Sequence, residues 1–295
     1  MSDYLVKSLV CDGHLRAYAI DATQTVREAQ TRQDTWSASS AALGRSLVGT
    51  LLLATASLKG DEKLTVKING NGPAGGIVVD GNSKGTVKGY IQNPHVHLPL
   101  NDKGKIDVKG AVGTEGFFAV TKDYGLKEPF TGQVPLVSGE IAEDFTYYVA
   151  KSEQIPSAFG LSVFVNNDNT IGTAGGFMIQ VLPNCPSEIL DKLEATLKNL
   201  TPISTMMQNG LTPEDMLNKL FGVENVEILE KMPVKFECDC SKERFAKALA
   251  SLPQKDVNEM IAEDHGATAV CHFCGNEYHF DEAELAEIAA QARMK

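Results

Sequence analysis

The sequence predicts an α+β protein with an N-terminal core of mainly antiparallel β-sheet and packed helices, then a helical linker and a small C-terminal α+β module. Three observations support this prediction. Glycine-punctuated short strands fill the first half of the chain, amphipathic helical stripes follow, and four of the six cysteines form two close pairs near the end. We place the core domain at residues 1–182, the linker at 183–232 and the module at 233–295.

Length and composition describe an ordinary folded protein with room for two or three domains. Of the 295 residues, 43% are hydrophobic and 22% are charged, unlike a disordered chain. The net charge of −11 opposes a phosphate backbone, so nucleic acid is not an expected partner. We expect no signal peptide and no membrane span, because glycine and polar residues interrupt the longest apolar stretch, 46–58. A cytoplasmic location follows, where thiols favour metal or redox chemistry.

The core is expected to begin with two short strands, Tyr4–Val10 and Leu15–Asp21, joined by a turn at Asp12-Gly13. A short helix follows, and a longer one starts near residues 37–40 and ends at Gly60. The leucines of the longer helix recur at helical spacing, so one of its faces should pack on a sheet.

Glycine is dense between residues 60 and 139, where short apolar runs alternate with turns as in antiparallel meanders. The expected strands are 64–68, 77–80, 86–91, 106–108 and 117–121. The stretch Gly70-Asn-Gly72-Pro-Ala-Gly75 has the glycine spacing of a dinucleotide site, which requires a helix to follow. Here the strand-like Ile77-Val-Val follows, so we interpret the stretch as a hairpin turn.

Two further features complete the expected core. His95-Val-His97 would place two imidazoles on one face of a strand, but no third ligand lies at useful spacing, so we interpret them as a solvated edge. A helix over 141–153 and strands over 161–165 and 171–182 end the domain.

Between residues 186 and 233 the pattern changes to short helices. Ser187 can cap a helix with an apolar stripe, and Thr212-Pro213 begins another that runs to Gly222. Half of the chain's eight methionines lie in this segment: Met206, Met207, Met216 and Met232. Such a stripe is either ordinary core or an adaptable binding surface, and the sequence leaves both interpretations open.

The chemistry of the chain is concentrated in two cysteine pairs, one of the form C-x-C and one of the form C-x-x-C. Together they can place four thiolates around one zinc ion, because each pair is a short chelating turn. The predicted ligands in the reduced state are Cys238, Cys240, Cys271 and Cys274. His272 and His279 could replace a sulfur, but four cysteines already complete a tetrahedron.

The module of 63 residues is close to the lower limit for a self-sufficient core. A structural zinc ion supplies about 10–16 kcal/mol of apparent binding free energy at neutral pH, so losing it should unfold the module. Zinc also holds the sulfurs as thiolates, which oxidants attack, and the second thiol of a pair can resolve the oxidised sulfur into a disulfide. Two pairs on one metal are therefore interpreted as a reversible redox switch.

Three functions fit such a switch. In the first, metal loss melts the module and exposes apolar helix faces over 190–232, which bind unfolded proteins without any enzymatic turnover. In the second, the C-x-x-C pair is a thiol-disulfide oxidoreductase site, although that motif usually lies near the start of a βαβ unit. The third is a zinc-ribbon binding module that contacts nucleic acid. From Pro233 onwards 7 basic residues face 12 acidic ones, which opposes the third reading.

The cysteine motifs extend into longer patterns, Cys238-x-Cys240-Ser-Lys-Glu-Arg244 and Cys271-His-Phe-Cys274-x-x-x-Tyr278-x-Phe280. Matching stretches in the core are Leu58-Lys59, Gly70-x-Gly72-Pro73, Tyr148 with Ser152-Glu-Gln154, and Gly175-Gly-Phe177. Through these residues the chain resembles the redox-regulated thirty-three-kilodalton heat-shock chaperone family over essentially its whole length.

The resemblance implies a cytoplasmic, ATP-independent holdase that is inactive while reduced and zinc-bound and is activated by oxidative stress. It implies disulfides within each pair, Cys238–Cys240 and Cys271–Cys274, then zinc loss, unfolding of the C-terminal region and linker, and binding of unfolded client proteins. A homodimer in the oxidised state and hand-over of clients to ATP-dependent chaperones are also implied. Cys11 and Cys185 lie outside the motif and receive no role.

Overall fold

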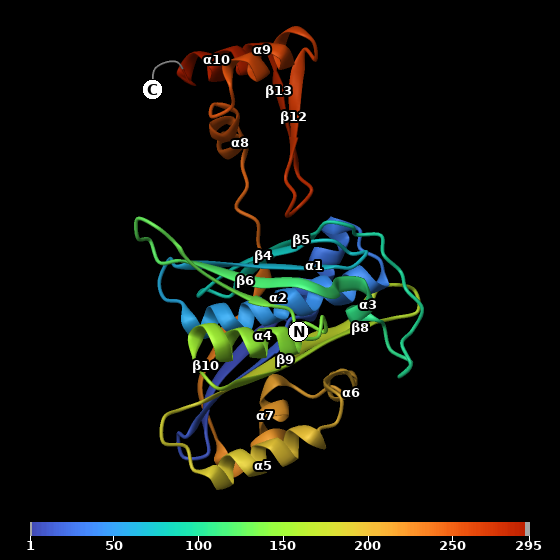
Figure 1. Ribbon diagram of the computed structural model, residues 1–295, viewed down its shortest axis with the longest axis vertical. Helices are drawn as coiled ribbons and strands as arrows, with labels where there is room; N and C mark the ends of the chain where they lie inside the picture. The colour runs from blue at the N-terminus through green and yellow to red at the C-terminus, as the bar shows by residue number, and fades with distance from the viewer. Residues whose placement is uncertain (1, 293–295) are drawn as a thin grey trace. The chain divides into compact units, whose positions relative to one another are not determined.

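The computed structural model describes residues 2–292 and divides into two compact units, with the boundary after Glu237. The first unit holds two large antiparallel-rich sheets with helices, and the second is a small α+β unit (Figure 1). The α+β class predicted from the sequence is confirmed.

One sheet of the first unit has the strand order β10-β1-β2-β9-β8, and every neighbouring pair is antiparallel. Its strands are β1 Tyr4–Val10, β2 Leu15–Asp21, β8 Ser157–Val165, β9 Ile171–Val181 and β10 Val226–Pro233. A four-residue turn joins β1 to β2, as the Asp12-Gly13 signal predicts. Strand β10 arrives from far along the chain and pairs with β1 at the edge of the sheet.

The other sheet has the order β11-β5-β4-β3-β6-β7. Its strands are β3 Lys63–Asn71, β4 Ile77–Asn82, β5 Thr86–Ile91, β6 Gly113–Asp123, β7 Phe130–Pro135 and β11 Lys235–Phe236. Along β3 the residues alternate between buried and more exposed, as expected for a strand with one face on the core. Gly70, next to the last residue of β3, packs against the backbone of Gly113, where an added Cβ would lie 2.4 Å from the carbonyl oxygen. The glycines around position 70 therefore form the turn that the sequence predicts and also allow close backbone packing.

Helix α2, Ser37–Ser57, lies between the two sheets and contacts β8 and β9 of one and β4 and β5 of the other (Figure 1). Because both sheets cover it, 17 of its 21 residues are buried, not only the one face that leucine spacing predicts. The other helical elements between β2 and β8 along the chain are α1 Thr23–Gln33, α3 Val108–Val112, α4 Ala142–Tyr148 and a π-helix over Val149–Glu153. Most of the large core is formed by these helices and the sheet faces beside them.

Gly49 allows α2 to approach Phe145 of α4. A Cβ at Gly49 would lie 2.4 Å from the fully buried Phe145 ring. We expect Gly49→Ala to destabilise the first unit by about 1–3 kcal/mol from overpacking, an effect larger than the helix-propensity gain of about 1 kcal/mol. Urea unfolding followed by the fluorescence of Trp36, the chain's only tryptophan, measures the change. The control is Gly76→Ala, whose Cβ meets nothing closer than Gln92 at 3.7 Å; equal stabilities would contradict the packing argument.

The opposite face of the β10-β1-β2-β9-β8 sheet is covered by three short helices, α5 Ser187–Lys198, α6 Ile203–Gln208 and α7 Pro213–Phe221 (Figure 1). Thr212 caps α7 through a capping box with Asp215, as the Thr-Pro signal predicts. A 3-10 turn over Val223–Asn225 then leads into β10. Helices and sheet face together form a second apolar cluster, separate from the large core.

The second unit consists of α8 Lys242–Leu249, α9 Gln254–Ala262, β12 Gly266–Val270, β13 Glu277–Asp281 and α10 Glu282–Ala292. Strands β12 and β13 form an antiparallel pair. The fully packed part of its core is small among the described residues and consists of Val257, Phe280, Leu285, Ile288 and Ala289. Most apolar side chains around this cluster are only partly buried, so little hydrophobic burial holds the unit together.

Candidate metal centre

Two short backbone segments of the second unit present the paired cysteines. Cys238 and Cys240 lie in the stretch just before α8. This stretch ends at Ser241, whose hydroxyl caps the helix. Cys271 and Cys274 lie in the turn between β12 and β13. That turn is closed by backbone hydrogen bonds from Cys271 N to Asn276 O (2.9 Å) and from Gly275 N to Cys271 O (2.8 Å).

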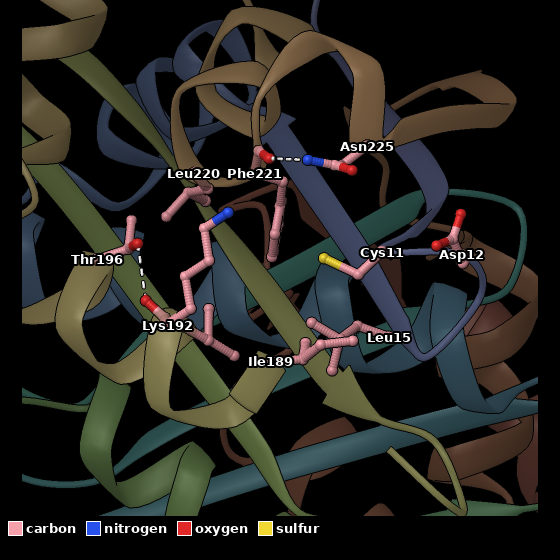
Figure 2. Close-up of a pocket in the computed structure, with 10 residues that line it drawn as sticks. Cys11, Asp12, Leu15, Ile189, Lys192, Thr196, Leu220, Phe221 and Asn225 are labelled. Atoms are coloured by element: carbon pink, nitrogen blue, oxygen red, sulfur yellow. Dashed lines mark hydrogen bonds between the residues drawn. The ribbon is translucent and has the colours of Figure 1, made fainter. Parts of the chain in front are cut away.

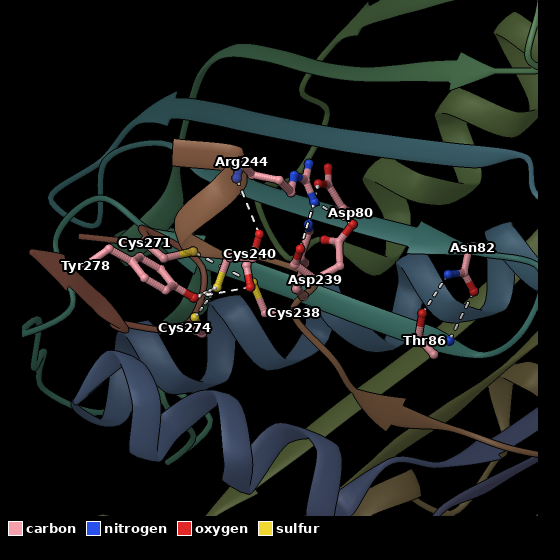
Figure 3. Close-up of polar contacts among 12 residues, drawn as sticks. Asp80, Asn82, Thr86, Cys238, Asp239, Cys240, Arg244, Cys271, Cys274 and Tyr278 are labelled. Carbon is pink, nitrogen blue, oxygen red and sulfur yellow. Dashed lines mark hydrogen bonds and ion pairs between the residues drawn. The ribbon is translucent and has the colours of Figure 1, made fainter. Parts of the chain in front are cut away.

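All four sulfur atoms converge on one point (Figure 3). They lie within 4.8 Å of one another, with Sγ–Sγ distances of 3.7 Å for Cys238–Cys271 and 3.3 Å for Cys240–Cys274. A zinc–sulfur distance of about 2.3 Å in a tetrahedron corresponds to sulfurs about 3.8 Å apart, so the spacing suits a metal ion. Cys271 and Cys274 are buried, whereas the other two are half-buried. The structure thus brings the four predicted ligands together, and the cluster could hold a metal ion.

The thiols have unequal electrostatic environments. Burial raises the pKa of both Cys238 and Cys274, and hydrogen bonds with neighbouring thiols add to the effect. Burial also acts to raise the pKa of Cys240, but hydrogen bonds from Tyr278 and the other thiols outweigh it and lower the pKa to about 7. A bound cation would favour the thiolate form of every sulfur, because a positive charge at a ligand sulfur displaces its proton.

Side chains around Cys240 contribute contacts that the spacing of the cysteines does not reveal (Figure 3). The hydroxyl of Tyr278 on β13 lies 3.2 Å from Cys240 Sγ and donates to the Cys240 carbonyl oxygen at 3.1 Å. Arg244 of α8 donates to the Asp239 carbonyl oxygen at 3.0 Å and forms an ion pair with the Asp239 carboxylate. In the sequence, Tyr278 is marked by its position two residues before Phe280. Along strand β13 this spacing turns Tyr278 and the buried Phe280 to the same side.

The histidines do not join the cluster. His279 is exposed and its Nδ1 lies 2.9 Å from Thr268 Oγ1, and neither it nor His272 belongs to the group of converging ligands. His95 and His97 in the first unit have separate partners, Asp34 and Ser37 respectively. Among residues 2–292 the four cysteines are the one group of three or more histidine, cysteine, aspartate or glutamate side chains whose ligand atoms converge.

Cys11 and Cys185 are also free thiols, but they lie in the first unit. Cys11 follows β1 and lines a pocket of about 220 Å³ beside Lys192, Ile189 and Phe221 (Figure 2). Burial raises the pKa of Cys11. Cys185 precedes α5 and packs at the edge of the same apolar cluster. Neither thiol is part of the converging group.

The chain is similar to known proteins over nearly its whole length. A family model described as "Hsp33 protein" matches residues 3–281. The chain belongs to the Hsp33 family. It is 66% identical to the 33 kDa chaperonin of Lactiplantibacillus plantarum, over 99% of each chain, and 54% identical to that of Staphylococcus aureus, over 96% of each. A crystal structure of the 33 kDa chaperonin of Thermotoga maritima is 39% identical, covers 100% of both chains and superposes with a TM-score of 0.92.

Membership of the Hsp33 family makes the chain a chaperone and not an enzyme, as the sequence predicts. Within the described residues, none of the helices is long and apolar enough to cross a bilayer.

Proposed function

We propose that this Hsp33-family chain is a redox-regulated, ATP-independent holdase that binds unfolded proteins under oxidative stress. The observation that carries the proposal is the convergence of two cysteine pairs within a unit that has a small core. Family membership supplies the class of activity. The converging thiols supply a way to regulate that activity, because their oxidation removes the ligands on which a small metal-bound fold depends.

The resting state in this proposal is reduced and holds one zinc ion. Its ligands are Cys238, Cys240, Cys271 and Cys274. When bound, zinc holds the sulfurs as thiolates and joins the stretch before α8 to the β12–β13 turn. Four thiolates and no carboxylate form a soft donor set, which favours zinc over magnesium or calcium.

The switch is oxidation within each pair. Cys271 and Cys274, as thiolates, together lose two electrons to hydrogen peroxide, and one S–S bond forms. The peroxide takes up two protons from the solvent and is reduced to two molecules of water. Cys238 and Cys240 react in the same way. A disulfide sulfur is a poor metal ligand compared with a thiolate, so the ion is released. Without it, the core formed around Phe280 and Leu285 is too small to keep the second unit folded.

The surface that we propose for client binding lies under α5, α6 and α7. Beneath these helices the sheet presents Val6, Ala17, Ala19, Phe177 and Ile179, all at most 3% exposed. The helices contribute buried apolar residues to the same cluster, chiefly Met206, Met207, Met216, Leu217 and Phe221. If the helices separate from the sheet, both faces become exposed apolar surface, which unfolded proteins bind. The methionines make that surface adaptable to many sequences.

The polypeptide chain links the switch directly to the cover, the three helices α5–α7 that lie over the proposed client-binding surface. Between α7 and Cys238 the chain forms the 3-10 turn, the edge strand β10 and the two-residue β11, and Glu237 N donates to Val87 O at 2.9 Å. We propose that unfolding of the redox-switch domain, 233–295, spreads along this segment into the linker, 183–232, while the core domain, 1–182, stays folded. Edge strands with exposed side chains are among the elements that open most easily.

Further parts of the proposal come from the resemblance to the redox-regulated family. They are a cytoplasmic location, a homodimer in the oxidised state, and hand-over of bound clients to ATP-dependent chaperones. Size-exclusion chromatography of reduced and oxidised protein tests the change in assembly.

The proposal predicts that hydrogen peroxide with mild heat activates the protein. Oxidised protein should suppress the aggregation of a chemically unfolded client in light-scattering assays without ATP, and reduced, zinc-loaded protein should suppress it far less. Zinc release, followed with a chromogenic chelator, should accompany activation. A variant with Cys271 and Cys274 both changed to serine cannot form the Cys271–Cys274 disulfide. The matched control is Cys11→Ser, which keeps both cysteine pairs.

Two results would contradict the proposal. One is equal suppression of aggregation by reduced and oxidised protein. The other is reduction of insulin disulfides at thioredoxin-like rates, which would instead favour a thiol-disulfide oxidoreductase that uses the C-x-x-C pair.

A further inference from the structure

The two halves of the thiol cluster are held in place by different means. Cys271 and Cys274 lie in a turn that the backbone closes on itself, through Cys271 N to Asn276 O and Gly275 N to Cys271 O. This turn joins the paired strands β12 and β13, whose register runs from Gly266–Asp281 to Val270–Glu277. The geometry of this pair is therefore set by the hairpin.

The stretch with Cys238 and Cys240 is tied down by side chains from other elements. Arg244 donates a hydrogen bond to the Asp239 carbonyl oxygen at 3.0 Å and forms an ion pair with the Asp239 carboxylate. Tyr278 donates to the Cys240 carbonyl oxygen at 3.1 Å, and its hydroxyl also lies 3.2 Å from Cys240 Sγ (Figure 3). The Tyr278 contact thus touches both the backbone and the sulfur of a single cysteine.

Tyr278 is itself fixed on the hairpin that carries the other pair. It lies opposite Ala269 in the β12–β13 register, only four residues after Cys274. Its ring is half-buried and packs on Phe245 of α8, with the ring centroids 5.1 Å apart. One side chain thus connects the C-x-x-C hairpin, helix α8 and the C-x-C stretch.

We propose that Tyr278 is a positioning residue that holds Cys240 in the cluster and so determines how readily the Cys238–Cys240 half opens. Its hydroxyl has a single proton and two acceptors on Cys240, the carbonyl oxygen and the sulfur. A donor that stays on Cys240 restrains the stretch and reduces the electron density that the sulfur offers to an electrophile. This inference deepens the proposed function and rests on it for the identity of the bound metal.

The test is Tyr278→Phe, which removes the hydroxyl and keeps the ring on Phe245. Reduced, metal-loaded protein is treated with limiting iodoacetamide, where each sulfur forms an S–C bond and expels iodide. Mass spectrometry then gives the alkylation rate of each cysteine. We expect the ratio of the Cys240 rate to the Cys274 rate to rise about fivefold, the effect of one lost hydrogen bond. In the cobalt-substituted protein the sulfur-to-cobalt charge-transfer bands should shift, while the d–d bands keep their tetrahedral pattern.

The matched control is Tyr124→Phe, which deletes the same atom from a 40% exposed tyrosine in the first unit and should change neither readout. An equal rise at all four cysteines would overturn the proposal, because it would mean that Tyr278 only stabilises the second unit. Unchanged rates would overturn it as well. Metal analysis of the wild-type protein is read separately. An absence of metal there would refute the zinc assignment, and the alkylation ratio would still decide the role of Tyr278.

Discussion

Removing the metal from the reduced protein is expected to unfold the second unit while the core domain, 1–182, stays folded. A structural zinc ion contributes about 10–16 kcal/mol of apparent binding free energy at neutral pH, whereas a core of this size contributes at most about 3–5 kcal/mol. The metal therefore outweighs the apolar cluster around Phe280 and Leu285. Amide hydrogen exchange before and after chelation should show protection lost throughout α8–α10 and β12–β13, and retained in strands β1–β9 of the core domain.

Single substitutions separate metal loss from other effects of a chelator. Cys271→Ser removes one of the four converging sulfurs and should lower zinc retention and the protection of the second unit together. Cys11→Ser removes a thiol outside the cluster and should leave both unchanged. If the second unit keeps its protected amides after complete metal removal, then packing alone supports it and the switch has no structural basis.

A charge placed under the α5–α7 cover is expected to activate the reduced protein without any oxidant. Met216 is fully buried between α7 and the sheet, so Met216→Lys must either bury an ammonium group or detach the helix. A destabilisation of the cover by about 3 kcal/mol raises its open population roughly a hundredfold. Suppression of client aggregation by the reduced variant, measured with bound zinc quantified in parallel, gives the result.

The control for the Met216 variant is Asn218→Lys, which adds the same charge to the same helix at a half-buried position outside the apolar cluster. It should behave like the parent protein. If Met216→Lys releases helix protection in hydrogen exchange but binds no client, the surface under the cover is not the binding site. Activation of both variants alike would point to added charge and not to opening.

Local patterns predicted most strands of the first unit, although β7, β10 and β11 were missed. The bounds of β1, β2 and β5 agree with the sequence prediction, because alternation and turn residues act over a few positions. The stretch 106–108 is an exception, since Asp107 accepts a hydrogen bond from Gly110 N and caps the short helix α3 where a strand was expected. The capping signal of one aspartate was weaker in the sequence than the apolar run around it.

Helix α2 is buried on more faces than its leucine spacing predicts, and the reason is different. Leucine spacing marks one apolar face, while serine and threonine on the other faces look like solvent positions. In the structure Ser46 and Thr55 are buried, and each hydroxyl donates to the carbonyl oxygen four residues earlier, at 2.8 Å in both cases. Small hydroxyl residues satisfied by their own helix can therefore face a second sheet, which a hydrophobicity pattern does not distinguish from water.

Long-range pairing set the limits of the prediction at the site as well. The four cysteines were found because chelation needs local spacing, C-x-C and C-x-x-C. Tyr278 and Arg244 were not identified as neighbours of Cys240 and Asp239, because their hydrogen bonds depend on how α8 and β13 fold. Strand β10 gave no clear signal for the same reason, since it is mostly exposed and its partner β1 lies at the other end of the first unit's sequence.

The short segment from Val226 to Phe236 forms an edge strand of one sheet and then an edge strand of the other. Its first part, β10, hydrogen-bonds along β1, and its last two residues, β11, pair in parallel with β5 of the other sheet. Any process that peels this segment away bares two rows of backbone amides and carbonyls at once. An extended polypeptide can add to such a row irrespective of its side chains. The same step that uncovers apolar surface thus also exposes strand edges, to which an unfolded chain can bind irrespective of its sequence.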